Sequence, residues 1–337
     1  MFNHPEPTIS RRNFVRAGII AGGAIGVGRV SLLLAAEPAV PVAPSSAELA
    51  RRTLGRTGVP VTVMTLGTAP CGFAKGVTIQ DIARIVNVAI DLGINSIDTA
   101  PAYEKAEEGV GLALGPRRKD VFLATKVGAD TVQAAEESLA NSLRLLKTDF
   151  VDLLYFHSLG NRKLESARDA EGAFTWLLKQ KQAGKCRFIG VSGHHLPRLF
   201  PGFLESGDVD VLLTVVNFVD RHTYRFEEQV LPVAEKHNVG IVAMKVFGGA
   251  RRSAGSYGNP QAPPELDVKH LPVAIRYALG VPGVATLNIG AHNEQQVRQN
   301  VEMVKNYQPL AAEEQEQLTV LGKELAGQWG PHFGPVA

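Results

Sequence analysis

This chain of 337 residues lacks the features that mark several protein classes. It has only two cysteines, Cys71 and Cys186, and no C-x-x-C pair, which excludes a disulfide framework. We expect two unpaired thiols, with a single bridge as the alternative. The net charge is only +2 and no basic stripe with interleaved aromatic residues occurs, so we expect no nucleic-acid partner. The candidate metal ligands, His157 and the pair His194–His195, are too few for a metal-dependent barrel hydrolase, and we expect no metal.

The chain also has no apolar run of the length that crosses a membrane. Residues 17–28 (AGIIAGGAIGVG) fall well short of the roughly 20 residues that a span needs. Arg11 and Arg12 precede this run in SRRNFVR, which resembles the twin-arginine export signal of bacteria, and a Pro/Ala/Ser-rich stretch follows it. We interpret residues 1–45 as a twin-arginine (Tat) signal and flexible lead-in that the Tat translocase recognises, and expect a periplasmic or otherwise exported protein. The alternatives are a basic tail with an amphipathic helix, or a membrane-tethered protein.

The composition is that of ordinary globular proteins, with 45% hydrophobic and 20% charged residues. From Leu54 strand-like and helix-like segments alternate without a break in composition, which predicts an α/β protein with a (β/α)8 TIM barrel. We place the barrel at residues 52–325, with an N-terminal hairpin, an extra C-terminal helix and a tail over residues 326–337. The rival, an open doubly wound sheet, would place a G-x-G-x-x-G turn after its first strand, and LGTAPCG lacks that spacing. Charge runs such as EEGV are expected to be solvated helix faces.

Four chemically active side chains lie at the ends of three successive predicted strands. Asp98 closes the strand INSID and Tyr103 follows it, Lys126 closes VFLATK, and His157 closes FVDLLYFH. Because strand C-termini share one face of a parallel barrel, we expect these side chains to converge there. An ammonium beside a phenol lowers the pKa of the phenol and makes it a better proton donor. We therefore predict Tyr103 as an acid, Lys126 and Asp98 as the groups that tune it, and His157 as the group that orients a carbonyl oxygen.

The sequence resembles the aldo-keto reductases from about Leu54 to Tyr307, in the segments GINSIDTAPAY, FLATKVG, DLLYFHS, GKCRFIGVSGHH and NIGAHNEQQVRQN. The first three segments carry the family's Asp, Tyr, Lys and His one for one. The resemblance implies a (β/α)8 barrel that holds a nicotinamide dinucleotide without a Rossmann domain. NADP(H) is the usual cofactor and NAD(H) the alternative. It also implies hydride transfer between the nicotinamide and a carbonyl carbon while Tyr103 protonates the oxygen.

The resemblance extends only in part to the cofactor site. The positions that match the family pattern are Ser192, Asn217, Gly290, His292, Gln296 and Asn300. Three positions depart from it: Gly193 replaces an Asn, Leu213 a Gln and Val216 a Tyr, so an aromatic platform for the nicotinamide is missing or supplied from elsewhere. His292 stands where a basic residue is often found. Since an imidazole offers a 2′-phosphate less charge than an Arg, the preference for NADP(H) has weaker support than dinucleotide binding itself.

These features together predict an exported NAD(P)-dependent oxidoreductase that reduces a small-molecule carbonyl to an alcohol, or runs the reverse reaction. The alternative is a non-catalytic subunit that binds the cofactor for redox sensing or protein interaction. The four-residue set argues against it, because a pure binder has no need of a tuned acid. In the resembled family the loops over the barrel mouth set substrate choice, here residues 247–268 and the tail after Leu310. Lys245 and the Gly248–Gly249 pair fit a loop that approaches phosphates or, equally, a barrel lip with a flexible turn.

Overall fold

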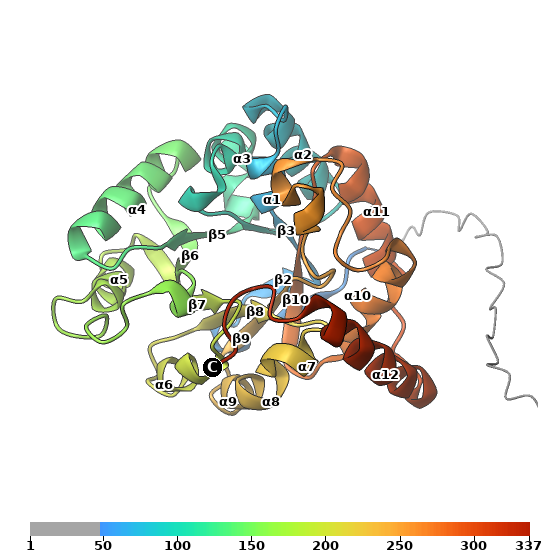
Figure 1. Ribbon diagram of the computed structural model, residues 1–337. Helices are drawn as coiled ribbons and strands as arrows, with labels where there is room; N and C mark the ends of the chain where they lie inside the picture. The colour runs from blue at the N-terminus through green and yellow to red at the C-terminus, as the bar shows by residue number, and fades with distance from the viewer. Residues whose placement is uncertain (1–47) are drawn as a thin grey trace, which may run out of the picture. The chain divides into compact units, whose positions relative to one another are not determined.

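A closed barrel of eight parallel strands forms the centre of the structure, a computed structural model that describes residues 48–337 (Figure 1). The strands lie in the order β10-β3-β4-β5-β6-β7-β8-β9, and helices connect them around the outside. The predicted (β/α)8 fold is confirmed. The signal predicted over residues 1–45 lies outside the described residues. The barrel strands are β3 (Met64–Gly67), β4 (Ser96–Asp98), β5 (Phe122–Val127), β6 (Val151–Phe156), β7 (Cys186–Gly193), β8 (Val211–Val215), β9 (Gly240–Met244) and β10 (Val284–Gly290).

The predicted N-terminal hairpin is present and closes one end of the barrel. β1 (Arg51–Thr53) pairs antiparallel with β2 (Pro60–Thr62), and Gly58 in the turn has a φ of 67°, a left-handed conformation that suits glycine. Leu54 and Val61 are buried in the apolar cluster inside the barrel. Because this cluster includes the first residues of β5 and β8, the hairpin covers the N-terminal ends of the strands. The C-terminal ends form the open mouth.

The long helices around the barrel are amphipathic. The second helix begins at a capping box, in which the Thr78 hydroxyl accepts from the Asp81 N–H and the Asp81 carboxylate accepts from the Thr78 N–H. Ile82 and Ile85 of this helix are buried in the core outside the barrel, whereas Arg84 is exposed. The long helices that follow the strands are α2 (Ile79–Asp91), α3 (Ala106–Leu114), α4 (Val132–Leu146), α5 (Ala173–Gln182), α10 (Leu271–Gly280) and α11 (Glu294–Lys305).

One predicted helix is wrong. The pattern predicts a single helix over residues 226–238, but two short helices occupy this region and a third precedes it. Arg225 has a φ of 57° and Pro232 lies in the first turn of the last helix, so neither junction continues a regular helix. The three are α7 (Arg221–Tyr224), α8 (Phe226–Gln229) and α9 (Leu231–Lys236). The sequence pattern also misses the short helices α1 (Ala69–Phe73) and α6 (Pro201–Leu204) and the 3-10 turns η1 (Gly55–Thr57), η3 (Gly115–Asp120), η4 (Leu159–Asn161) and η5 (Pro197–Leu199).

Two segments cross the mouth of the barrel, and both were expected to set substrate choice. The β9–α10 loop, residues 245–270, reaches across to α1, where the Lys75 N–H donates to Gly258 O at 3.0 Å. The predicted extra helix is α12 (Ala312–Trp329), and the tail after it crosses the ends of β8 and β9 (Figure 1). The β9–α10 loop contains the 3-10 turns η6 (Arg252–Ala254), η7 (Ser256–Gly258) and η8 (Val268–His270).

The described residues carry neither a disulfide nor a cluster of metal ligands. Cys71 and Cys186 are both free and buried, which confirms the expectation of two unpaired thiols. Within residues 48–337 no group of three or more His, Cys, Asp or Glu side chains is placed to hold a metal ion. None of the helices in this part of the chain has the length and apolar character needed to cross a membrane.

Candidate active site

Three neighbouring strands bring the four predicted catalytic side chains to the mouth of the barrel. Asp98 ends β4, Lys126 is the last residue but one of β5, and His157 directly follows β6. Tyr103 ends the 3-10 turn η2 (Pro101–Tyr103), which follows β4. Because β4, β5 and β6 are adjacent in the barrel, their parallel pairing places these groups side by side.

Asp98 and Lys126 form a buried ion pair. Lys126 Nζ donates to Asp98 Oδ1 and Oδ2, both at 2.6 Å, and to Thr99 O at 2.8 Å. The Lys126 and Asp98 side chains are only 1% and 4% exposed. These three bonds use every proton of the ammonium. Burial lowers the pKa of Lys126, while the charges of Asp98 and Glu107 oppose that shift. The pair is thus a fixed and internally compensated charge beneath the mouth.

The phenol of Tyr103 lies against this ion pair and next to His157. Its ring centroid is 5.0 Å from Lys126 Nζ and 6.2 Å from the centroid of the His157 ring, which it meets edge-on. Burial raises the pKa of Tyr103 well above its ordinary value, and the nearby Asp98 and Tyr257 raise it further. The expectation that Lys126 lowers this pKa is wrong here, because burial of the phenol and the negative charge of Asp98 outweigh the ammonium. Tyr103 therefore keeps its proton throughout the neutral range.

His157 is a neutral imidazole. Burial lowers the pKa of His157 to about 3, and the positive charges of Lys126 and Arg162 act in the same direction. Its backbone N–H donates to Val127 O at 2.8 Å, which holds the residue at the end of β6. A neutral ring at this place suits the predicted task of hydrogen-bonding a carbonyl oxygen.

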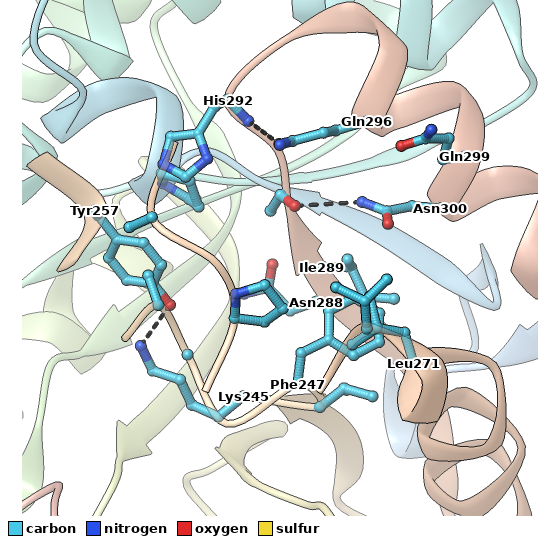
Figure 2. A pocket seen from close by; sticks show the side chains of 18 of the residues that line it. Lys245, Phe247, Tyr257, Leu271, Asn288, Ile289, His292, Gln296, Gln299 and Asn300 are labelled. Atoms are coloured by element: carbon cyan, nitrogen blue, oxygen red, sulfur yellow. Dashed lines mark hydrogen bonds between the residues drawn. The ribbon is translucent and has the colours of Figure 1, made fainter. Parts of the chain in front are cut away.

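A cavity of about 290 Å³ lies near the ion pair, although none of the four catalytic side chains lines it (Figure 2). On one side of the cavity, Lys245, which directly follows β9, donates from Nζ to Oη of Tyr257 in η7 at 2.9 Å. Asn300 enters from α11 on the other side. Asn288 of β10 lines the cavity and donates to Asp98 Oδ1 at 3.0 Å. This amide links the cavity directly to the buried ion pair.

Four of the six predicted cofactor-binding residues line this cavity: Gly290, His292, Gln296 and Asn300. Gln296 Oε1 accepts from the His292 N–H at 2.8 Å, and Asn300 Nδ2 donates to Gly290 O at 3.3 Å (Figure 2). The His292 ring is buried, and its Nε2 has no hydrogen-bond partner among the described residues. Burial lowers the pKa of His292, so the ring is neutral at pH 7. At Gly290 a Cβ would lie 2.4 Å from Pro70 Cγ, which leaves room for glycine alone.

The other two predicted residues, Ser192 and Asn217, do not line the cavity. Ser192 Oγ accepts from the Ser158 N–H at 3.1 Å, at the ends of β7 and β6. The Asn217 amide donates to Asp220 Oδ2 at 2.7 Å and to Lys245 O at 2.9 Å, and its oxygen accepts from two backbone N–H groups. Asn217 thus uses its full hydrogen-bonding capacity inside the protein. In this structure it positions the Lys245 backbone and has no free group for a cofactor.

Comparison with known proteins supports the same interpretation as the geometry of the site. A model of the "Aldo/keto reductase family" matches residues 63–322. The chain belongs to the aldo/keto reductase family. The uncharacterized oxidoreductase YqkF of Bacillus subtilis is 28% identical over 301 residues, which cover 78% of this chain and 94% of that protein. L-galactose dehydrogenase of Arabidopsis thaliana is 29% identical over 294 residues, which cover 78% of this chain and 91% of that enzyme.

Solved structures of aldo-keto reductases share the fold. The holo form of a Bacillus halodurans aldo-keto reductase gives a TM-score of 0.66 at 25% identity, over 85% of this chain and 100% of that one. A Klebsiella pneumoniae aldo-keto reductase in complex with NADPH gives 0.63 at 21% identity, over 82% and 95%. This chain is an oxidoreductase of the family, whose members generally carry out NAD(P)-dependent carbonyl reduction.

The residues of the cavity fit the dinucleotide that aldo-keto reductases use. The unpartnered Nε2 of His292 is a buried polar atom that a ligand would satisfy. Lys245 is the one charged side chain among the described residues that line the cavity, and it offers a cation to a phosphate. Gly290 packs against Pro70, which lines the same cavity.

Sequence reasoning misses three groups of the site. Asn288 has a usable signal, since it is a polar residue inside the apolar strand VATLNIG. Tyr257 has none, because its loop reads only as irregular. Glu107 was expected on a solvated face but is fully buried, where the Thr125 hydroxyl donates to its Oε1 at 2.5 Å and burial raises the pKa of the carboxyl. The pattern failed there because the third helix packs closely against the barrel behind Lys126.

Proposed function

We propose that this chain transfers hydride between a nicotinamide dinucleotide and a small-molecule carbonyl or alcohol, with Tyr103 as proton donor. One observation carries the proposal: a protonated phenol, a buried ion pair and a neutral imidazole converge at one place, which Asn288 links to the cavity. When bound, the dinucleotide supplies or accepts the hydride. NADP(H) is the favoured cofactor and NAD(H) the alternative.

Each catalytic side chain has a separate task in this proposal. Tyr103 holds its proton at neutral pH and gives it to the carbonyl oxygen as the alcohol forms. Lys126, 5.0 Å from the phenol ring, stabilises the negative charge that remains on Tyr103, and Asp98 keeps the ammonium charged despite its burial. His157 donates a hydrogen bond from its neutral ring and orients the carbonyl. In the reverse direction the same groups remove the proton of an alcohol.

The proposed cofactor-binding residues would contact different parts of the dinucleotide. His292, Gln296 and Asn300, with Gly290, would hold the adenosine end, since all four line the cavity around α11. Lys245 would pair with a phosphate. Ser192, matched to the family residue that contacts the carboxamide, would hold the nicotinamide end. The Klebsiella relative in complex with NADPH supports NADP(H) as the favoured form.

Replacement of Tyr103 by Phe tests the proposal. Turnover of a carbonyl panel should fall by about 10²- to 10⁴-fold, the usual worth of a positioned acid, while NADPH binding and the circular dichroism spectrum stay unchanged. Tyr307→Phe removes a phenol far from the site and should keep full turnover. Equal turnover in the two variants refutes the assignment of Tyr103. Negligible turnover even in the wild type, with tight dinucleotide binding, supports the sensing or interaction subunit instead.

We also propose that the Tat translocase exports the folded protein to the periplasm. The support is the arginine pair Arg11 and Arg12 in SRRNFVR, followed by a short, weakly apolar run. Cell fractionation of the full chain should recover the protein outside the cytoplasm, and the double variant Arg11→Lys/Arg12→Lys should leave it in the cytoplasm. An unchanged distribution in the double variant refutes export by this route.

A further inference from the structure

The tail after α12 is fixed over the mouth by specific hydrogen bonds. The Phe333 N–H donates to Tyr224 Oη at 2.7 Å, and the Tyr224 hydroxyl donates to Gly334 O at 3.2 Å. His332 Nε2 lies 2.9 Å from Asp220 Oδ1, a carboxylate that is almost fully buried. These contacts place residues 332–334 at one defined position against α7.

This anchor is continuous with the cavity. Asp220, which binds His332 of the tail, also accepts from Asn217, and Asn217 donates in turn to Lys245 O. Lys245 lines the cavity. A line of hydrogen bonds therefore runs from the tail to the wall of the cavity, and the tail is part of the site's framework.

The aromatic ring of the tail contacts Lys245 of the cavity wall and the neighbouring His194. The centroid of the Phe333 ring is 5.6 Å from the His194 ring and 5.6 Å from Lys245 Nζ. Burial lowers the pKa of His194, and the positive charges of Lys245 and Lys126 act in the same direction. Phe333 and His194, which directly follows β7, thus form a pair of rings.

The same part of the mouth lacks the side chains that the family resemblance leads one to expect there. A Cβ at Gly193 would lie 2.7 Å from Cζ of the fully buried Phe200, so an Asn has no room. Leu213 points into the apolar cluster inside the barrel, and Val216 is buried in the core outside it. None of these positions offers an aromatic surface at the mouth, whereas Phe333 does.

We propose that Phe333, paired with His194, forms the aromatic wall against which the nicotinamide ring of the cofactor lies. This inference rests on the proposed function, because it requires that a nicotinamide dinucleotide binds in the cavity that Lys245 lines. A planar aromatic ring stacks on another with a contribution beyond simple burial of area. The tail at the C-terminal end of the chain thereby supplies the aromatic surface that Val216 does not.

Equilibrium binding to the full-length protein tests this wall directly. The probes are NADPH and NADH, each compared with the corresponding compound that lacks only the nicotinamide ring, ADP-ribose 2′-phosphate and ADP-ribose. Phe333→Leu, which keeps an apolar side chain, should weaken NADPH and NADH by about 2- to 12-fold, the worth of one stacking contact, and leave both ring-less probes unchanged. Phe333→Tyr should bind like the wild type. Val336→Ala, in the exposed end of the same tail, is the matched control.

A second variant keeps the proposal testable if the tail does not tolerate a change. His194→Leu removes the partner ring without touching the bonds to Tyr224 and Asp220, and should cause the same selective loss. Unchanged affinity for NADPH and NADH in both Phe333→Leu and His194→Leu overturns the proposal. Equal losses for all four probes also overturn it, because the tail then supports the whole site without facing the ring. A wild type that binds none of the probes refutes the proposed function itself.

Discussion

Replacement of Asp98 by Asn is expected to destabilise the fold far more than the loss of an exposed ion pair. Lys126 is 1% exposed, and its three protons go to Asp98 and Thr99 alone. An Asn side chain keeps the shape but removes the only charge that compensates the ammonium at hydrogen-bonding distance. Breaking a buried pair in this way costs about 3–5 kcal/mol, against about 0–1 kcal/mol for an exposed pair. We expect the free energy of unfolding to fall by about 3–5 kcal/mol at pH 7.

The loss has a defined dependence on pH. Burial already lowers the pKa of Lys126 from 10.5, and Asp98 opposes that shift, so Asp98→Asn lowers the folded-state pKa further. Between the folded-state pKa and 10.5 the unfolded chain binds a proton that the folded chain does not. Stability therefore rises with pH across this window. The variant should lose stability as the pH falls below 10.5 and level off once the folded-state pKa is passed.

Urea unfolding, followed through the fluorescence of Trp176 and Trp329 at neutral and alkaline pH, measures both quantities. The controls are Lys126→Met and the double variant Asp98→Asn/Lys126→Met, which should recover much of the loss because no buried charge remains. A loss below about 1 kcal/mol at neutral pH, or a loss independent of pH, refutes the view that Asp98 keeps a buried ammonium charged.

Two histidines give further predictions. Because burial lowers the pKa of His157 to about 3, the pH profile of kcat/KM should show no step from His157 in the range of about pH 5–8, where an ordinary histidine titrates. A step near neutral pH that disappears in His157→Gln contradicts this prediction. His292→Arg should raise the affinity for NADPH relative to NADH by about tenfold, since a permanent fork-shaped charge replaces a neutral ring. Binding titrations with both dinucleotides measure this ratio, and an equal gain for NADH contradicts the assignment of His292 to the 2′-phosphate.

The barrel is predictable from the sequence because its signals are local. Short apolar runs such as VFLAT and VATLNIG, separated by helical periods, mark strands that are buried on both faces. The breaks between α7, α8 and α9 have no such signal, since the left-handed Arg225 depends on how the chain packs there. The buried Glu107 shows the same limit, because its charge indicates a surface that the packing of α3 removes.

The candidate site is likewise predictable from the sequence only in part. The positions of Asp98, Lys126 and His157 follow from strand ends alone, because parallel strands bring their C-termini to one face. The protonation of Tyr103 does not follow, since it depends on how deeply the phenol is buried and on the nearby charge of Asp98. Asn217 matches the family pattern, yet its hydrogen bonds are all made within the protein.

Catalysis and cofactor affinity thus depend on different parts of the chain. The proposed acid and its supporting groups belong to β4, β5 and β6 and to a turn beside them, so the barrel itself holds them in place. The proposed nicotinamide wall comes from Phe333, in a tail that hydrogen bonds to Tyr224 and Asp220 hold over the mouth. A change in the tail should therefore alter the affinity for the dinucleotide and spare the proton donor. A change at Tyr103 should remove turnover and spare the affinity, so the two sets of variants test the two proposals independently.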